Sequence, residues 1–306
     1  AEKTGGENAR AAERRKTDAY EDAAKAREKV EVLQPFSVTL APTGLHAGRK
    51  VLEAEGLSGG YDAARPVIRD FSLTVTGPER IAITGPNGAG KTTMMDIITG
   101  KTAPDTGSVW FGSRHNLLTM NEPEIATLGI GRKFQKPTVF PEHTALENLE
   151  LAMAGPKGTW QALLQPVTGQ QYDWMAQTLE TVGLLAQKDQ LAGALSHGQK
   201  QWLEIAMVLA TQPKLVLLDE PTAGMTPDET RRTTQLIKQL AGSGDYTFMI
   251  TEHDMDVVFN LADRILVMHR GEKLFAGTPE EVKYHPEVRV AYLGEADDEA
   301  VEEANP

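Results

Sequence analysis

The sequence predicts an α/β domain built around a mainly parallel β-sheet. A short β-branched run over residues 80–84, a glycine-rich loop and a helical segment follow one another directly. Strand-like apolar runs alternate with helical segments on both sides of that loop. The chain has 306 residues, of which 40% are hydrophobic, so it can bury the core that one large domain requires.

The glycine-rich loop has the pattern of a phosphate-binding loop. It consists of Gly85, Pro86, Asn87, Gly88, Ala89, Gly90, Lys91 and Thr92, and Thr93 continues into a helix that ends before Gly100. Between a strand and a helix, such a loop turns backbone amides toward an anion, and the helix N-terminus adds partial positive charge. We predict that Lys91 reaches the β- and γ-phosphates of a nucleotide and that the Thr92 hydroxyl ligates Mg²⁺. The alternative is a turn that only connects strand to helix, but it does not explain Lys91 and Thr92.

Composition argues against several classes of protein. There is no cysteine, so neither a disulfide framework nor a thiolate metal site can form. No apolar run approaches the roughly 20 residues of a membrane-spanning helix, and we expect no secretory signal because the charged N-terminus lacks an apolar core. The net charge is −12, and residues 295–306 contribute six acidic side chains and no basic one. The remaining, mildly acidic body argues against broad nucleic-acid binding.

Three segments are predicted along the chain. Residues 1–48 form a charged N-terminal extension, in which residues 1–33 interleave acids and bases without a wide apolar stripe. We interpret it as a solvated helix or a disordered arm, with a docking segment for a partner as the alternative. The folded domain is expected over 49–294, and residues 295–306 form a solvated acidic tail.

Two strand-like segments precede the loop. Residues 51–55 form the first, and residues 67–75, with alternating apolar side chains, form the second, as a hairpin-like pair. The turn between them carries Tyr61, an aromatic about two dozen residues ahead of the loop. Taken alone, Tyr61 is more readily interpreted as an ordinary surface tyrosine.

Residues 105–210 are expected to contain one strand and then mostly helices. The expected elements are a strand at 108–111, a helix at 143–153, a loop-rich insertion at 154–171 and a helix at 172–187. Thr144 and Glu147 have the spacing of a capping box at the start of the first helix. A helical subdomain is therefore predicted at about 136–210.

Alternation of strands and helices resumes after this subdomain. Strands are expected at 214–219, 247–251, 264–268 and 273–276, and an amphipathic helix at 228–241. The first of these strands ends in Asp219 and Glu220, and the C-terminal edge of such a strand faces the nucleotide in open α/β sheets. Asp219 is predicted to hold Mg²⁺, directly or through water, and Glu220 to accept a proton from the attacking water. Acids on a strand end that turns into solvent are the alternative.

Together these segments resemble the ATP-binding-cassette (ABC) ATPases over roughly residues 51–294. The loop Gly85–Thr92 is similar to the Walker A motif, and the strand that ends at Glu220 is similar to Walker B with its catalytic glutamate. The family signature is matched by Leu195-Ser196-His197-Gly198-Gln199, with His197 where glycine is commoner. Among phosphate-loop families, this pentapeptide just ahead of Walker B is specific to the ABC ATPases.

The resemblance implies a RecA-like phosphate-loop core with an antiparallel β subdomain and an inserted α-helical subdomain. It also implies that Tyr61 stacks on the adenine of ATP, because an aromatic ring offers a π-face. Gln135 would ligate Mg²⁺ and sense the γ-phosphate, and His253 would hydrogen-bond the γ-phosphate and the attacking water. Taken alone, Gln135 is a solvent-facing amide and His253 a structural histidine. With Glu220 they form the expected catalytic set.

The resemblance implies two kinds of partner. Ser196, His197, Gly198 and Gln199 begin a helix and would bind the ATP held by a second ABC subunit, so that ATP joins a head-to-tail dimer. The surface near residues 134–151 would dock on a membrane permease at the cytoplasmic face of the membrane. An external solute-binding protein would then be an indirect partner, and no nucleic acid is expected.

The expected activity is ATP hydrolysis that powers an importer of a small polar solute. The signature, the insertion near 155–169 and the segment 291–294 resemble ATPases of branched-chain amino acid importers. The segments 131–140 and 223–226 resemble the urea-importer branch, which points to urea or a short amide. Thr226 stands where most members of the family have aspartate.

Two alternatives belong to other classes: a soluble ABC ATPase that acts on nucleic acid or ribosomes, and an exporter ATPase. About 128 residues separate Lys91 from Asp219, which leaves no room for the long coiled coil of chromosome-type ATPases. Translation-factor types carry two cassettes, whereas one is present here, and no basic stripe with interleaved aromatics is found. The sequence leaves open the solute and whether the partner ATPase is identical or a sibling.

Overall fold

The computed structural model describes residues 48–62, 65–136, 138–153, 167–244 and 246–293. The predicted N-terminal extension apart from Gly48, most of the insertion at 154–171 and the acidic tail at 295–306 lie outside the described residues. The predictions for those three segments therefore stay predictions, as do the boundaries of the domain and of its helical subdomain.

A six-stranded sheet has the strand order β10-β9-β3-β8-β7-β6. Its strands are β3 (Arg80–Thr84), β6 (Ile130–Lys133), β7 (Leu215–Asp219), β8 (Thr247–Thr251), β9 (Arg264–His269) and β10 (Glu272–Gly277). Neighbours from β9 to β6 run parallel, and β10 is antiparallel to β9. Strands β7 and β8 are buried along their whole length, as central strands of a parallel sheet are. The predicted mainly parallel α/β core is confirmed.

A second sheet has four antiparallel strands in the order β2-β1-β4-β5. These are β1 (Arg49–Gly59), β2 (Ile68–Gly77), β4 (Thr106–Phe111) and β5 (His115–Asn116). Along β2 the apolar side chains of Phe71, Leu73 and Val75 are buried and alternate with more exposed residues, so one face of the strand packs inward. The predicted pairing of the first two strands and the strand at 108–111 are both confirmed.

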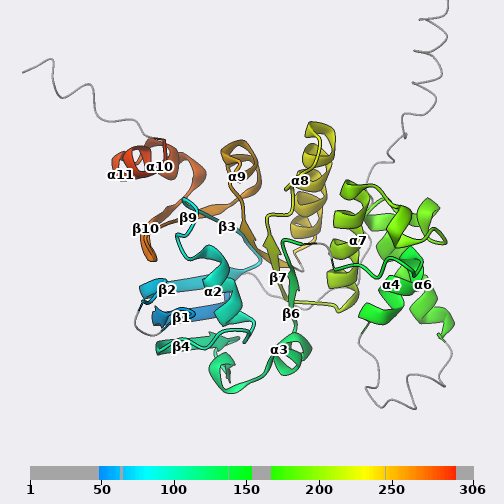
Figure 1. Cartoon of the computed structure of the whole chain (residues 1–306), viewed down its shortest axis with the longest axis horizontal. Helices are drawn as coiled ribbons and strands as arrows, with labels where there is room; N and C mark the ends of the chain where they lie inside the picture. Colours follow the sequence, from blue (N-terminus) through cyan, green and yellow to red (C-terminus); the bar gives the residue numbers. More distant parts are fainter. Residues whose placement is uncertain (1–47, 63–64, 137, 154–166, 245, 294–306) are drawn as a thin grey trace, which may run out of the picture. The chain divides into compact units, whose positions relative to one another are not determined.

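Helix α2 (Lys91–Ile98) connects the packing of the two sheets. Met94, Met95, Ile97 and Ile98 belong to one cluster of buried side chains that also draws residues from both sheets. Figure 1 shows α2 next to β1 and β2, with the parallel strands behind it. Because protein cores are close-packed, the loop that leads into this helix is held in a fixed place between the two sheets.

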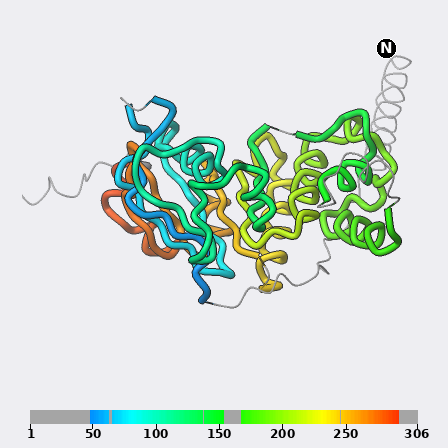
Figure 2. Tube along the Cα trace, turned by 90° about the horizontal axis from the view of Figure 1, so that it is seen from below, coloured from blue at the N-terminus to red at the C-terminus, as the bar shows by residue number. Residues whose placement is uncertain are grey.

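Three helices form the helical part: α4 (Ala145–Ala152), α6 (Gly169–Thr181) and α7 (His197–Ala210). They pack on one another and, in Figure 2, lie at the end of the described domain away from the antiparallel sheet. The predicted capping box of Thr144 and Glu147 is confirmed at the start of α4. The helix predicted at 172–187 ends earlier, at Thr181, because Gly183 takes a left-handed φ of 73° before the 3₁₀ turn η2 (Leu185–Gln187).

The expectation of one strand and then mostly helices over 105–210 is wrong, because the short β5 and the strand β6 also lie there. Helix α3 (Glu122–Leu128) leads into β6, an edge strand of the central sheet that pairs with β7. Two of the four residues in β6 are the basic Arg132 and Lys133, so its sequence does not have the apolar pattern of a buried strand. Both charges are buried against carboxylates of neighbouring elements, which is why the strand tolerates them.

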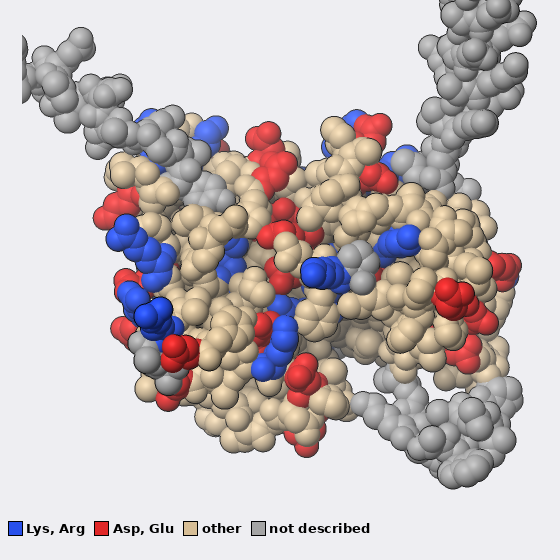
Figure 3. All heavy atoms as spheres, viewed as in Figure 1, with Lys and Arg blue, Asp and Glu red and all other residues tan. Residues whose placement is uncertain are grey.

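The remaining elements cover the sheet edges and the C-terminal region. They are the 3₁₀ turns η1 (Leu117–Thr119) and η3 (Ala192–Ala194), the helices α8 (Pro227–Gly242), α9 (Met255–Leu261), α10 (Pro279–Tyr284) and α11 (Pro286–Val288), and the π-helical turn η4 (Arg289–Leu293). On the face shown in Figure 3, basic and acidic side chains are interspersed. Among the described residues, none of the helices has both the length and the apolar character that crossing a bilayer requires.

Candidate functional site

The phosphate loop needs its glycines for steric reasons. Gly85, Gly88 and Gly90 have φ values of 146°, 80° and 97°, in the region that glycine adopts most readily. A Cβ atom on Gly85 would lie 2.1 Å from the carbonyl oxygen of Met268 in β9. The loop therefore passes too close to the sheet for any side chain, and its backbone is left free to approach a ligand of the size of a phosphate.

Lys91 is buried and points back over the loop. Its Nζ donates to the carbonyl oxygens of Gly85 at 2.5 Å and Pro86 at 3.2 Å. Burial lowers the pKa of Lys91, while the carboxylates of Glu220 and Asp219 raise it. Within the described residues Lys91 makes no ion pair. A buried ammonium group that contacts only neutral carbonyl oxygens fits an anionic ligand such as a nucleotide phosphate.

The three predicted catalytic residues lie together at the ends of three strands. Glu220 follows β7, and its carboxylate accepts from Gln135 Nε2 at 2.7 Å through Oε2. Its other oxygen, Oε1, lies 2.7 Å from Nε2 of His253, which follows β8. Glu220 has a φ of 47°, an uncommon conformation for a residue with a side chain, and such strain is concentrated at functional sites. The structure brings the predicted catalytic set into one hydrogen-bonded group.

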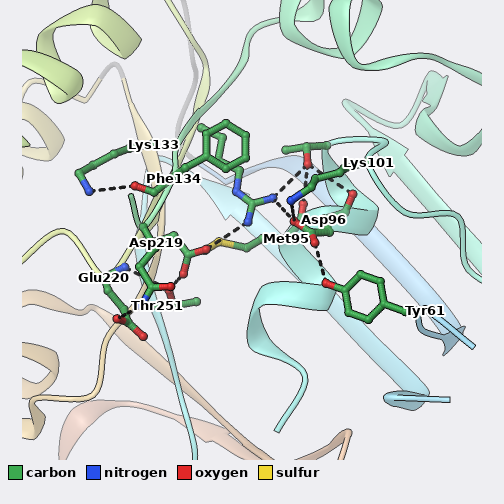
Figure 4. Close-up of polar contacts among 12 residues, drawn as sticks. Tyr61, Met95, Asp96, Lys101, Lys133, Phe134, Asp219, Glu220 and Thr251 are labelled. Carbon is green, nitrogen blue, oxygen red and sulfur yellow. Dashed lines mark hydrogen bonds and ion pairs between the residues drawn. The ribbon is translucent and has the colours of Figure 1, made fainter. Parts of the chain in front are cut away.

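Asp219 is held by protein groups on both of its carboxylate oxygens. Thr251 Oγ1 donates to Oδ1 at 2.6 Å, and Arg132 Nη2 lies 3.1 Å from Oδ2. Arg132 also pairs through Nη1 with Asp96 of α2 at 2.6 Å, and Tyr61 Oη donates to the same Asp96 at 2.8 Å. Figure 4 shows Tyr61, Asp96, Asp219 and Thr251 joined in this order through the guanidinium group. Two residues that the sequence interpretation passed over, Arg132 and Asp96, thus connect predicted site residues.

The predicted metal ligands supply oxygen donors of the kind Mg²⁺ prefers. Thr92 offers a hydroxyl that is solvent-exposed at the start of α2, Asp219 a carboxylate and Gln135 an amide oxygen. In the described parts of the chain, no group of three or more His, Asp or Glu side chains could hold a metal ion alone. That arrangement suits Mg²⁺, which is usually bound through one or two protein groups together with nucleotide phosphates and water. The donor set therefore fits a metal that arrives with ATP.

Tyr61 presents its ring to solvent. The residue is 69% exposed, and its hydroxyl is anchored to Asp96. The pKa of Tyr61 is raised by burial of the hydroxyl and by the hydrogen bond to Asp96. An exposed ring that is fixed at its polar end is available to stack on a planar base.

The predicted signature residues form the start of α7. Ser196 is its N-cap, and its hydroxyl accepts from the backbone N–H of Gln199 at 3.2 Å in a capping box. His197 Nε2 lies 3.1 Å from the carbonyl oxygen of Ala223, and a Cβ on Gly224 would approach the imidazole to 3.0 Å. Figure 1 shows β6 and β7 between α7 and α2, so the structure does not bring Ser196 to the phosphate loop of its own chain.

Thr226, at the position where the resemblance leads one to expect aspartate, is a helix cap. Its hydroxyl accepts from the backbone N–H of Glu229 at 3.3 Å, and Glu229 Oε2 accepts from the N–H of Thr226 at 2.8 Å. Glu252, another residue passed over, is buried between β8 and the loop after β7. It accepts from Thr222 Oγ1 at 2.6 Å and from Thr222 N–H at 3.0 Å, and burial raises its pKa. These contacts fix the loop that follows Glu220.

Gly198→Ala is expected to lower stability, because a Cβ there would lie 2.2 Å from Oε1 of Glu229. To make room, the Glu229 side chain must shift, and since its Oε2 caps α8, we expect this to weaken the capping box, whose full loss is about 1 kcal/mol. For a domain of this size that corresponds to a decrease in Tm of roughly 2–4 °C, measured by thermal unfolding. Gly242→Ala is the matched control, since nothing lies within 4 Å of its Cβ position. Equal Tm values for both variants would contradict this account.

Comparison with known families gives two matches. The family model described as ABC transporter matches residues 68–223, just over half of the chain. A model described as branched-chain amino acid ATP-binding cassette transporter matches residues 272–298. The first match spans the phosphate loop, the signature and Glu220 but stops before His253.

Curated relatives match over most of their length. The high-affinity branched-chain amino acid transport ATP-binding protein LivG of Salmonella typhimurium is 38% identical over 236 residues, which cover 75% of this chain and 92% of LivG. The lipopolysaccharide export system ATP-binding protein LptB of Acidithiobacillus ferridurans is 33% identical over 246 residues, covering 80% of this chain and 98% of LptB.

Solved structures agree with the sequence matches. The crystal structure of a nucleotide-free ATP-binding cassette from an ABC transporter has a TM-score of 0.70 at 31% identity, and the match covers 80% of this chain and 100% of that one. The dimeric structure of a bacterial ABC transporter cassette has a TM-score of 0.63 at 25% identity, covering 74% of this chain and 98% of that one.

Proposed function

This chain belongs to the ATP-binding subunits of ABC transporters, and on that premise we propose that it powers uptake of a small polar solute through a separate permease. As an ABC ATPase it hydrolyses ATP, and subunits of this family work with membrane permeases and dimerise. The observation that carries the ATPase part of the proposal is the contact of Gln135 and His253 with Glu220, whose carboxylate acts electrostatically on Lys91 of the phosphate loop.

Each residue of the site has a role in this proposal. Backbone amides of residues 85–92 and the Lys91 ammonium bind the phosphates, and the exposed ring of Tyr61 stacks on adenine. Thr92, Gln135 and Asp219 would hold Mg²⁺, which when bound offsets the negative charge of the phosphates. Glu220 lies where it can take a proton from water, and His253, 2.7 Å away, orients it.

The start of α7 serves the second subunit. Ser196 and the first amides of α7 form a helix N-terminus, which suits an anion, yet β6 and β7 separate them from the phosphate loop of the same chain. We infer a head-to-tail dimer in which Ser196, His197, Gly198 and Gln199 contact the nucleotide of the other subunit. A dimeric bacterial cassette among the structural relatives supports this arrangement.

The permease is proposed to dock on the surface near residues 134–151. Phe140 and Leu151 are 47% and 56% exposed there, so the surface offers two large apolar side chains to a partner. A cavity of about 320 Å³ is lined by residues of α3, β6 and α7, including Ile125 and Met207, and by Phe134, Thr138 and Ala152 of the proposed docking segment and its flank. A subunit docked in this way would lie at the cytoplasmic face of the membrane as a peripheral protein.

The proposed solute is a branched-chain amino acid. The name of LivG and the match of residues 272–298 support this choice. Urea or a short amide is the second candidate, and its support is the resemblance of segments 131–140 and 223–226 alone. The alternative to import is export, and its support is the similarity to LptB, which is named for lipopolysaccharide export.

Reconstitution with a permease tests the proposal. The permease that co-purifies with the chain is placed in lipid vesicles with its solute-binding protein, and uptake of labelled leucine, valine and urea is measured with and without ATP. We expect ATP-dependent uptake of leucine or valine that Glu220→Gln abolishes. ATP-dependent urea uptake would select the second candidate, and ATP-dependent extraction of lipid with no uptake would overturn the importer assignment.

A further inference from the structure

We propose that Arg132 and Asp96 are positioning residues that couple the base-binding Tyr61 to the metal-side Asp219. The proposal rests on the roles of Tyr61 and Asp219 given under the proposed function. Hydrogen bonds and ion pairs connect these four side chains in one continuous run from Tyr61 to Asp219 at the end of β7, and Figure 4 labels Tyr61, Asp96 and Asp219 along it. Neither Arg132 nor Asp96 belongs to the predicted site, and each touches a residue that does.

Asp96 is the centre of the run. Its side chain is 2% exposed, and a buried carboxylate is costly unless charged and hydrogen-bonding groups surround it. Tyr61 Oη donates to Oδ2 at 2.8 Å, while Oδ1 lies 2.6 Å from Arg132 Nη1 and 3.6 Å from Lys101 Nζ. The two oxygens of Asp96 thus bind different groups: Oδ2 accepts from the Tyr61 hydroxyl and Oδ1 pairs with the Arg132 guanidinium.

Arg132 joins Asp96 to Asp219 with two different nitrogens of one planar group. Its side chain is 4% exposed, and its Cζ lies 4.7 Å from the centroid of the Phe134 ring, which covers one face. Because the guanidinium group is rigid, a shift of the Asp96 carboxylate changes the position at which the Asp219 carboxylate makes its best hydrogen bond. A lysine could not do this, since its single nitrogen is a point charge on a flexible stem.

The Asp219 side chain is held at both carboxylate oxygens, so it cannot compensate for such a shift. Oδ1 accepts from Thr251 at 2.6 Å, and Oδ2 is held by Arg132 at 3.1 Å. Tyr61, at the other end, is mostly exposed, so its ring depends on the hydroxyl for its position. Binding of adenine at Tyr61 is therefore expected to change the affinity of the Asp219 side for Mg²⁺. By linkage, Mg²⁺ binding must change the affinity for adenine by the same factor.

A double-mutant cycle tests this coupling by binding alone. The affinity for ATP in the presence of Mg²⁺ is measured by displacement of a fluorescent ATP analogue in Tyr61→Phe, Asp219→Asn and the double variant. Tyr61→Phe keeps the stacking ring and removes only the hydroxyl. We expect the combined effect to differ from the product of the single effects by about threefold or more, as in connected side-chain networks.

Two controls separate coupling from general loosening. In an Arg132→Met background the coupling between Tyr61→Phe and Asp219→Asn should disappear, whereas lowered stability by itself would leave it in place. Tyr61→Phe combined with Gln135→Ala should be additive, because Gln135 contacts Glu220 and not the run. Thermal unfolding of every variant without nucleotide checks that each one folds.

The outcomes are distinct. Additive effects of Tyr61→Phe and Asp219→Asn in a chain that binds ATP would overturn the coupling and leave the proposed function intact. Coupling that survives Arg132→Met would assign the connection to another route and would also overturn the role of Arg132. Absence of ATP binding in the unmodified chain would remove the proposed function and this inference together.

Discussion

Glu220→Gln is expected to lower the steady-state rate of ATP hydrolysis by about 10²–10⁴-fold, the usual contribution of a general base. The substitution keeps the size of the side chain and one acceptor oxygen but removes the basic carboxylate. ATP binding should be retained, because Lys91 and the phosphate loop are untouched. Hydrolysis is measured as phosphate release in the reconstituted transporter or with the isolated chain.

The same variant is expected to accumulate an ATP-bound dimer. If ATP joins two subunits, a chain that binds but does not cleave it stays closed, and light scattering at saturating ATP should report twice the mass of one chain. The geometry favours this outcome, since Gln135 and His253 can still hydrogen-bond an amide at position 220. Gln and Glu tolerate the φ of 47° at this position equally well. The substitution therefore removes the basic carboxylate without a change of backbone conformation.

Glu281→Gln is a suitable control for Glu220→Gln. Glu281 is exposed and serves in the capping box of α10, away from the phosphate loop, so its substitution should leave hydrolysis unchanged. Normal turnover by Glu220→Gln would assign the base to another group. His253, 2.7 Å from Glu220, would then be the first residue to test.

The resemblance to the ABC ATPases was sufficient to predict that Gln135, Glu220 and His253 lie together. Gln135, Glu220 and His253 are far apart in the chain, yet each follows a strand of one sheet, and the carboxyl ends of parallel strands lie at one edge. The strands predicted at 214–219 and 247–251 are consistent with this, since Glu220 follows β7 and His253 follows β8 in neighbouring parallel strands. The glycine loop could also be predicted from local sequence, because its positive φ angles and close approach to the sheet require glycine.

The residues that connect the site were not predictable in the same way. Arg132 and Lys133 make β6 look polar, and their acidic partners lie 36 to 87 residues away along the chain. Nothing local in the sequence indicates that Asp96, between Met95 and Ile97 of α2, will face Arg132 rather than solvent. The pairing of these buried charges depends on how α2, β6 and β7 pack against one another, which the local sequence does not determine.

Lys91→Ala is expected to weaken ATP binding by roughly 10- to 100-fold, since a hydrogen bond to a charged group contributes about 1.5–3 kcal/mol. The ammonium group is buried and, in the part of the chain that the structure describes, its hydrogen bonds go to the carbonyl oxygens of Gly85 and Pro86, so it can turn to a phosphate without breaking an ion pair there. Affinity is measured by displacement of a fluorescent ATP analogue, and hydrolysis should fall in parallel at low ATP.

Lys273→Ala controls for the loss of one positive charge, because Lys273 is exposed on β10. A general electrostatic effect would lower ATP affinity to a similar extent in both variants, whereas a specific phosphate contact lowers it only in Lys91→Ala. Folding is checked by thermal unfolding, since the truncation removes the Lys91 donor from the carbonyl oxygens of Gly85 and Pro86, of which Pro86 keeps the N–H of Ala89 at 3.1 Å. Unchanged ATP affinity in a folded Lys91→Ala chain would mean that Lys91, the one residue of the loop with a positive charge, does not contact the phosphates.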